Sequence, residues 1–388
     1  MIVRITNSAR EYEWGSPNLI PDYFGFAETG RPMAEIWFGT HPGSLTQAVA
    51  ESGQTIGTLL DLRAQKPLDF LLKILAAETP LSIQAHPNTQ QAQAGFAREN
   101  ALGIPLDSPA RNYRDDRHKP EMIVALTRFV ALSGFRPLAE SEALFDALGQ
   151  VAGLEAEFEV LSKDLRAGLK VLVEKLLHQR GRLGALTSRL AQVAEQLTQD
   201  SPPTLLDNRQ HLQLATELEA LYPGDPGVLI SLLMNLLTLQ PGQAVQLGAG
   251  NIHAYVSGLG VEIMAASDNV LRGGLTPKHI DVDELCSILD FSVSNVVPFQ
   301  PKELVKGLYE YPRAVADYLL YRVEVGGQNL LADLKIAQPS IFLCTSGEVA
   351  VSDSTEQRLV LRKGEAAYLA DARFYSFAGS GMGYLATS

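Results

Sequence analysis

The chain has 388 residues, of which 46% are hydrophobic and 20% charged, and its formal net charge at pH 7 is -12. This length exceeds one ordinary hydrophobic core and predicts two or three domains, and the composition excludes a disordered chain. Because nucleic acid and anionic membranes attract positive surfaces, the negative charge argues against both as partners, and an anionic substrate would need a local cationic pocket.

The first residues, MIVRITNSAREYEWGSPNLI, contain no apolar run of the kind found in a signal peptide, and no later run reaches the roughly 18 to 20 apolar residues of a membrane-spanning helix. We therefore expect a cytoplasmic protein. The two cysteines, Cys286 and Cys344, lie far apart and outside any CxxC spacing. We predict that both are buried as small hydrophobic side chains, without a disulfide or a thiolate metal site.

Residues 1–137 predict a β domain, because short apolar runs such as AEIWFGTHP and MIVALTRFVALSGF alternate with Pro and Gly turns. The run DFLLKILAA at 69–77 fits a strand or a helix, and its period does not separate the two. After the HPN turn, NTQQAQAGFARENALGI predicts a short helix that Asn88 or Thr89 caps.

Residues 138–239 predict a helical domain, because Leu, Val and Ala recur there at spacings of three and four with charges between them. Breaks are expected at the Ser-Pro-Pro of 201–203 and the GDPG of 224–227. This block has no cluster of chemically capable side chains, so we expect it to serve packing and to support a lid.

Residues 240–292 return to short β-branched runs and Gly-rich turns, and residues 293–388 alternate apolar and polar positions with turns every eight to twelve residues, as a β-sandwich or jelly roll does. The prediction is a mainly β fold with a helical domain. Its first β domain comprises 1–137 and 240–292, the helical domain 138–239 interrupts it, and a second β domain at 293–388 closes the chain.

Four polar residues in strand-like sequence, Gln84, His86, Glu121 and His253, form a candidate metal site. Gln84 and His86 share one strand face because they are two residues apart, and Lys119 and Glu121 have the same relation. His253 lies in the Gly-flanked stretch GAGNIHAYVSG. Two imidazoles, a carboxylate and an amide oxygen suit Zn²⁺ or another divalent first-row ion. A lone strand histidine is more often a hydrogen-bonded core residue, but together these residues favour a metal site.

The segment VEIMAASDNVLRGGLTPK contains charges among small and apolar residues: Glu262, Asp268, Arg272 and Lys278. One interpretation is a surface loop with an Asp-Arg pair. The other is that Arg272, together with Lys119, forms the cationic pocket that an anionic substrate requires. No GxxxxGK[ST] or GxSxG motif and no complete dinucleotide fingerprint occurs in the sequence.

Six motifs resemble the type I mannose-6-phosphate isomerases, also called phosphomannose isomerases. They are YEWGS at 12–16, AEIWFGTHPGS at 34–44, LSIQAHP at 81–87, HKPEM at 118–122, GNIHAYVSG at 250–258 and SDNVLRGGLTPK at 267–278. The resemblance implies two cupin (jelly-roll) domains with a helical domain between them. It also implies reversible conversion of mannose 6-phosphate to fructose 6-phosphate.

The resemblance further implies one Zn²⁺ per chain, held by Gln84, His86, Glu121 and His253. Ile252 stands where the family usually has a proline and Gly273 where an alanine is frequent, and neither change removes a ligand.

The isomerisation requires a positioned acid/base and stabilisation of an enediol oxyanion. We predict Lys119 or His118 for proton transfer, Asp268 to orient or share the proton, and Arg272 to stabilise the enediolate or hold the substrate. Substrate contacts are expected from Ser82, Lys278, Trp14, Glu262 and Tyr255.

Two other functions stay open at this point. A cupin-type Fe(II) oxygenase would use the two histidines and the glutamate as a facial triad, and a sugar-binding cupin protein would have lost its chemistry. The expected partner is a small sugar phosphate, without nucleic acid or membrane, and we expect a monomer or a weak homo-oligomer.

Overall fold

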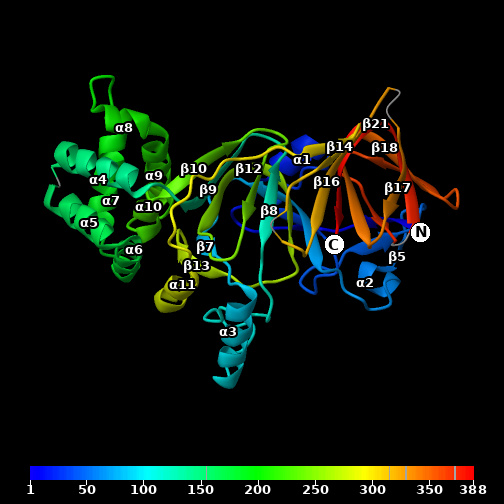
Figure 1. Cartoon of the computed structure of the whole chain (residues 1–388), viewed down its shortest axis with the longest axis horizontal. Coiled ribbons are helices and arrows are strands. Elements are labelled where there is room, and N and C mark those ends of the chain that lie inside the picture. Colours follow the sequence, from blue (N-terminus) through cyan, green and yellow to red (C-terminus); the bar gives the residue numbers. More distant parts are fainter. Residues whose placement is uncertain (154, 314, 328–329, 371–372) are drawn as a thin grey trace.

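The computed structural model describes residues 1–153, 155–313, 315–327, 330–370 and 373–388. Figure 1 shows an elongated molecule with helices gathered at one end, β-strands in the middle and at the other end, and one helix projecting below the strands. The helices are α1 (Leu19–Phe24), α2 (Leu59–Leu62), α3 (Thr89–Ala101), α4 (Leu138–Ala152), α5 (Glu155–Ala167), α6 (Leu169–His178), α7 (Gly184–Glu195), α8 (Pro203–Asp207), α9 (Arg209–Leu221), α10 (Pro226–Ser231) and α11 (Val282–Ile288).

The strands of the described residues fall into two sheets. We name the first the site sheet; it contains β2 (Ala9–Arg10), β3 (Glu35–Phe38), β6 (Phe70–Ala77), β7 (Ile83–Ala85), β8 (Glu121–Ala125), β9 (Phe129–Phe135), β10 (Met234–Leu239), β11 (Ala244–Leu247), β12 (His253–Ala265) and β13 (Leu271–Gly274). The second is the C-terminal sheet, with β1 (Ile2–Thr6), β4 (Gln47–Val49), β5 (Thr55–Thr58), β14 (Lys302–Val305), β15 (Leu308–Glu310), β16 (Leu319–Val325), β17 (Leu331–Ile336), β18 (Ser340–Asp353), β19 (Arg358–Arg362), β20 (Ala366–Leu369) and β21 (Arg373–Thr387).

Residues 69–77 and the helix after the HPN turn have the following structures. The run that fitted a strand or a helix forms β6, which pairs antiparallel with β3 on one side and β12 on the other. Asn88 caps α3: its side chain accepts the backbone N–H of Gln91, and the Gln91 side chain accepts the N–H of Asn88. Both cysteines are free and buried, as predicted.

The helical prediction is wrong for the last six residues of 138–239. These residues form β10, which pairs antiparallel with β9. A short apolar run such as MNLLTL carries no decisive period, and the long-range pairing with β9 supplies the backbone hydrogen bonds that a helix would otherwise provide.

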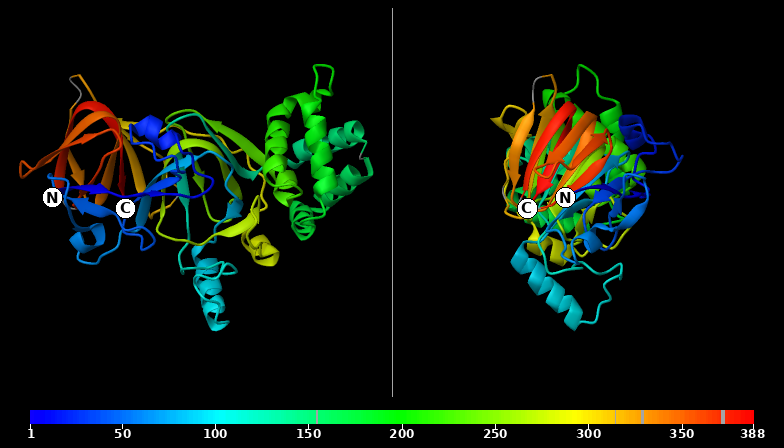
Figure 2. Two further views of the ribbon diagram at one scale, coloured as in Figure 1. Left: turned by 180° about the vertical axis from the view of Figure 1, so that it is seen from behind. Right: turned by 90° about the vertical axis from the view of Figure 1, so that its right-hand side faces the viewer.

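Strands from both ends of the chain share the C-terminal sheet, because β1 lies between β20 and β4. This pairing runs across the predicted boundaries between the two β domains. The end-on view in Figure 2 shows both termini among these strands, and it shows α3 projecting from the body.

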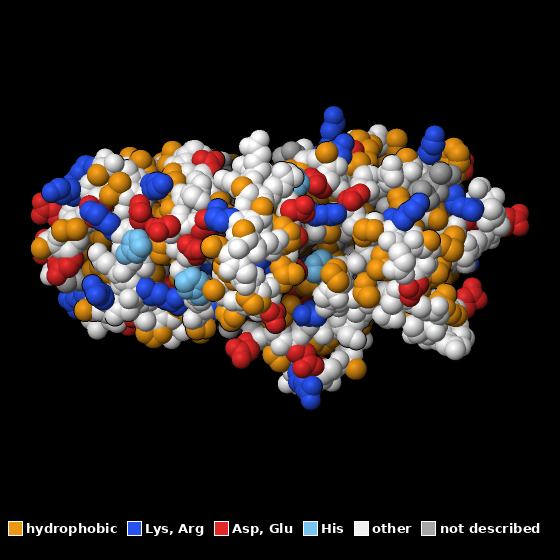
Figure 3. All heavy atoms as spheres, turned by 90° about the horizontal axis from the view of Figure 1, so that it is seen from below, with side chains coloured by type: hydrophobic (Ala, Val, Ile, Leu, Met, Phe, Trp, Pro, Cys, Tyr) orange, Lys and Arg blue, Asp and Glu red, His pale blue; other side chains and the backbone are white. Residues whose placement is uncertain are grey.

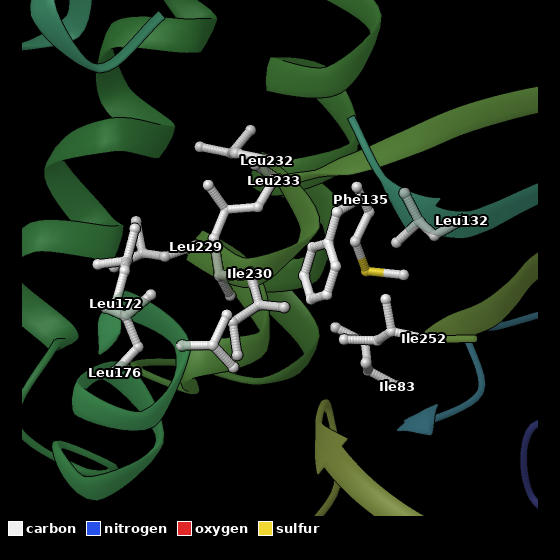
Figure 4. Packing of buried hydrophobic residues seen from close by; sticks show 14 of the residues in the cluster. Ile83, Leu132, Phe135, Leu172, Leu176, Leu229, Ile230, Leu232, Leu233 and Ile252 are labelled. Atoms are coloured by element: carbon white, nitrogen blue, oxygen red, sulfur yellow. The ribbon is translucent and has the colours of Figure 1, made fainter. Parts of the chain in front are cut away.

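Period-2 alternation lets the same strands serve two environments. Ile83 and Ala85 of β7, Ala254 of β12 and Leu271 of β13 are buried in the core formed with the helices. Figure 4 shows the helix side of this packing, where Leu229 and Leu233 lie between α6 and the strands. The residues between these apolar positions face away from the helical core.

The charged surface is mixed in sign. Figure 3 shows Lys and Arg side chains interspersed with Asp and Glu over the face seen from below. No helix within the described parts of the chain is long and apolar enough to span a membrane.

Candidate metal centre and cationic cavity

Strand register brings three predicted site residues into one row. Gln84 in β7 lies opposite His253 at the start of β12 and opposite Arg272 in β13. Directly opposed residues in neighbouring strands project to the same face, so the side chains of this row face away from the helical core.

Three buried side chains of the types that bind metals lie close together at this row: His86, Glu121 and His253. His86 Nε2 lies 3.3 Å from Glu121 Oε1, and His253 Nε2 lies 3.4 Å from Glu121 Oε2. The side-chain amide of Gln84 ends 3.3 Å from His253 Nε2. The structure thus gathers all four predicted metal ligands in one place.

Backbone carbonyls orient both imidazoles. His86 Nδ1 donates to the carbonyl of Asn269 at 2.7 Å, and His253 Nδ1 donates to the carbonyl of Asn251 at 3.0 Å. Each bond places the ring proton on Nδ1, which leaves the Nε2 lone pair facing the centre of the cluster.

The cluster fits a divalent metal ion. Among the described residues, the buried atoms His86 Nε2 and Glu121 Oε2 have no hydrogen-bonding partner, and such atoms are costly to bury unless something binds them. Burial, aided by the charge of Lys119, lowers the pKa of His86 to about 4, so its imidazole is neutral and able to donate to a metal.

Lys119 is paired with a ligand of the cluster, its Nζ lying 2.9 Å from Glu121 Oε1. Burial by itself would raise the pKa of Glu121, but the nearby cation and the imidazoles outweigh it and hold the pKa well below its usual value. The glutamate is therefore ionised, and the cluster keeps one anionic ligand.

A cavity of about 780 Å³ opens beside the cluster. The structure brings to its wall six of the residues that the sequence analysis assigned to catalysis, substrate binding or metal binding: Trp14, Ser82, Gln84, Asp268, Arg272 and Lys278.

Three cations of this wall have no acidic partner. Arg114, Arg272 and Lys278 all line the cavity, and none forms an ion pair within the part of the chain that the structure describes. Burial and the charge of Arg114 lower the pKa of Arg272, and burial with the charges of both arginines lowers the pKa of Lys278. Uncompensated cations facing one cavity form an anion-binding site.

His118 lies outside this cavity. Its Nε2 contacts Asp317 Oδ1 at 2.7 Å, and it lines a separate hollow of about 700 Å³ together with Ser388. The neighbouring residue Lys119 points to the metal cluster instead. The strand-adjacent turn therefore separates the two residues that the sequence analysis considered for proton transfer.

Glu262 and Tyr255 also lie away from the cavity wall. Both are buried in a network in which Lys73 Nζ lies 2.9 Å from Glu262 Oε2 and 3.4 Å from Glu35 Oε1. The Tyr255 hydroxyl donates to Glu262 Oε1 at 2.9 Å. Burial and the nearby Glu262 charge raise the pKa of Tyr255 well above its usual value, so the phenol stays protonated.

Arg114 and Asn269 are two site residues that were not predicted from the sequence. Asn269 is fully buried, and its side chain accepts the N–H of Arg114 at 2.7 Å and donates to the carbonyl of Arg117 at 2.8 Å. It thereby ties the loop that carries Arg114 to the residue whose carbonyl orients His86. Arg114 could have been predicted as a site residue from the run of charged residues that precedes HKPE. No local pattern distinguishes Asn269 as a site residue.

The fold and site together define a metal-binding protein of the cupin type with a cavity for a small anion. Residues 2–138 match the family model described as phosphomannose isomerase type I, catalytic domain. The chain is 34% identical to the mannose-6-phosphate isomerase of Salmonella typhimurium, with 94% of each chain covered. It is 33% identical to that of Homo sapiens, with 84% of this chain and 81% of the human one covered. The chain belongs to the family of type I mannose-6-phosphate isomerases.

Solved structures of the family are similar along the whole chain. The Salmonella typhimurium enzyme bound to fructose 6-phosphate and zinc has a TM-score of 0.86 at 32% identity, and a zinc-bound mannose 6-phosphate isomerase has the same values. Both comparisons cover 100% of this chain and 99% of the other. The predicted fold class and family are confirmed.

Proposed function

We propose that this chain interconverts mannose 6-phosphate and fructose 6-phosphate and uses one zinc ion. The observation that carries the proposal is the His86–Glu121–His253 cluster. Gln84 lies beside it and lines the cavity, whose wall carries three cations without an ion-pair partner among the described residues. A sugar phosphate offers both groups that such a site needs: hydroxyl and carbonyl oxygens for the metal, and a phosphate for the cations.

The proposed ligands are Gln84, His86, Glu121 and His253. A bound zinc ion supplies electrostatic polarisation of the oxygens on the reacting carbons. Gln84 is a neutral ligand, so Glu121 is the single anionic member of the set, and more of the positive charge remains for the sugar.

We assign the phosphate to the outer cations and the reacting oxygens to the inner one. Arg272 lies directly opposite Gln84 in the strand register, which favours a role in stabilising the enediolate. Arg114, Lys278 and Ser82 line the same cavity and supply donors for the phosphate.

The aldose-to-ketose direction removes the proton from C2 and delivers it to C1 through a cis-enediol, while a proton leaves O2 and one reaches O1. Among the candidate acid/base groups, Asp268 lines the cavity and Lys119 lies beside the metal cluster. His118, on the far side of the turn, is the least favourably placed of the three. We keep Trp14, which lines the cavity, as a substrate contact. Glu262 and Tyr255 do not line the cavity, and we propose that they support the site through the buried network around Lys73.

We further propose the domain division 1–137 with 240–292, 138–239 and 293–388, corrected in that β10 belongs to the site sheet and β1, β4 and β5 belong to the C-terminal sheet. We also propose a cytoplasmic location and a monomer or weak homo-oligomer without nucleic acid or membrane partners. The net charge of -12 supports the last point.

The test is a coupled assay for fructose 6-phosphate, run with metal analysis, with and without a chelator. Turnover that is lost with the metal and restored by zinc supports the proposal, and zinc-loaded protein without turnover contradicts it in favour of a non-catalytic sugar-binding protein. Turnover under nitrogen excludes an oxygenase, which needs O₂.

A further inference from the structure

His41 is a buried residue that is neither a proposed metal ligand nor a proposed substrate contact. It follows β3, is 9% exposed, and its Nε2 lies 3.3 Å from Asp268 Oδ2. More than 200 residues separate the two in sequence, so only the tertiary fold brings them together.

The turn at THPGS fixes the imidazole and its proton. The N–H of Ser44 donates to the carbonyl of His41 at 3.1 Å, which closes a β-turn with Pro42 at its second position. The N–H of Gly43 donates to Nδ1 at 3.1 Å. Because Nδ1 accepts this N–H, the ring proton lies on Nε2, the nitrogen that faces Asp268.

Trp37 and Gly43 pack against the His41 ring and hold its Nε2 toward Asp268. Trp37 packs against the ring at a centroid distance of 5.1 Å, edge to face. A Cβ on Gly43 would lie 3.2 Å from Nδ1, so the absence of a side chain there lets the backbone approach the ring.

Asp268 is the point at which this arrangement reaches the cavity. Its backbone N–H donates to Asp115 Oδ2 at 2.8 Å, and its side chain is 42% exposed. Within the described part of the chain, His41 is the one hydrogen-bonding partner of its carboxylate, so the second oxygen is free to accept from a ligand. Burial raises the pKa of Asp268, but His41, Lys119 and Lys73 together outweigh it, and the carboxylate stays ionised.

We propose that His41 is a positioning residue that acts through Asp268: it holds one carboxylate oxygen so that the other accepts a hydrogen bond from a sugar hydroxyl during the proton transfer. The inference rests on the proposed function and deepens it. A carboxylate with one anchored oxygen loses its rotational freedom before the reaction, which is the benefit of a preorganised acceptor.

Two substitutions of His41 separate the anchor from the turn. His41→Gln carries an amide donor near the position of Nε2 and can still reach Asp268. His41→Asn carries its amide near the position of Nδ1, so it preserves the contact with Gly43 and loses the one with Asp268. We expect kcat to fall about 10-fold in H41N and to stay within about 3-fold of the parent in H41Q, with zinc content and KM unchanged in both.

Asp268→Asn completes a double-mutant cycle. If His41 acts through this carboxylate, adding H41N to D268N costs no further activity, because the shared contribution is already lost. Additive losses, equal losses in H41N and H41Q, or full activity in H41N would each overturn the proposal, as would loss of zinc from H41N. Should H41N not fold, His41→Met, which fills the space beside Trp37 without a donor, replaces it. A parent protein without isomerase activity would overturn the proposed function and is seen before any variant is made.

Discussion

The two sheets of this protein are built alike and filled differently. Both are antiparallel, and both bury alternate side chains. The buried residues of the C-terminal sheet are mainly apolar, with Phe342, Val349, Val351, Leu361 and Phe377 among them, and Asp353 is its one buried charge among the described residues. The site sheet instead buries Glu35, Lys73, His86, Glu121, His253 and Glu262.

The difference shows what a buried polar interior requires. Charges removed from water must be paired or bound to a metal, and in the site sheet each one is: Lys73 lies between two glutamates, and Lys119 pairs with Glu121. The apolar neighbours on the opposite faces, packed on the helices and on the C-terminal sheet, hold these groups in place. The C-terminal sheet therefore stabilises the fold, whereas the site sheet carries the proposed metal ligands.

The largest expected effect comes from removing a ligand from the site sheet. His253→Ala should abolish stoichiometric zinc binding and lower activity by on the order of 10³-fold, because the remaining groups cannot complete the coordination. Metal analysis with the isomerase assay measures both quantities. His211→Ala, which removes a histidine outside the site, is the matched control and should keep its zinc. Stoichiometric zinc in the His253 variant would contradict the proposed ligand set.

Removing Arg272, the cation opposite Gln84, tests the catalytic step while the metal site stays intact. Arg272→Ala should reduce kcat by about 10²-fold while zinc content stays at the parent level, because the stabilised charge develops only in the transition state. Steady-state kinetics gives the result. The control is Arg98→Ala. Arg98 is an exposed residue of the projecting helix α3 that pairs with Glu284 of α11, and its removal should leave kcat unchanged. Parent-level turnover in Arg272→Ala would remove this residue from the mechanism.

The supporting role of the C-terminal sheet is tested in its core. Phe342 is fully buried and packs against Phe377 at a centroid distance of 5.1 Å. Phe342→Ala should lower the free energy of unfolding by about 3 to 5 kcal/mol through the cavity it creates, with zinc content and kcat unchanged at low temperature. Denaturant unfolding measures it, and Phe374→Ala at an exposed position is the control. A loss of zinc in the folded variant would show that this sheet shapes the site directly.

The smallest expected effect concerns a histidine that serves structure alone. Burial, aided by Arg136, lowers the pKa of His211 to about 4, against 6.5 when unfolded. Between these values the unfolded chain binds a proton that the folded chain does not, so the free energy of unfolding falls as the pH is lowered from 6.5 to 4. We expect about 2 kcal/mol from this residue, less than the full shift implies because the ring is partly exposed.

His211→Gln removes that contribution. The difference between parent and variant unfolding, measured across pH 4 to 6.5, isolates it from the carboxylates that also titrate there. Parallel pH profiles for the two proteins would show that the ring titrates normally in the folded state.

Many of the proposed site residues could be predicted from the sequence, because they lie in local sequence patterns. The spacing of Gln84 and His86 gives a shared strand face, and the Asn88 cap marks the helix that follows. The apolar residues on either side of these polar positions predicted that the segments are strands. The family motifs then supplied the metal and the sugar, which no spacing can name.

Other features depended on contacts that no local pattern contains. The helical prediction failed at Met234–Leu239, because this short apolar run has no decisive period and pairing with β9 makes it a strand. The turn before β8 sends His118 to Asp317 and Lys119 to the metal cluster. Glu262 and Tyr255 lie in the buried network around Lys73, although their sequence context was equally compatible with a position on the cavity wall.

The sequence by itself determined which residues are polar and which of them share a strand face, because these follow from local chemistry and periodicity. The tertiary structure alone decided that Gln84 meets His253 on one side and Arg272 on the other, and that His41 reaches Asp268. The physical reason is that alternation fixes the direction of a side chain relative to its own strand, whereas strand pairing over long stretches of chain fixes what that side chain meets.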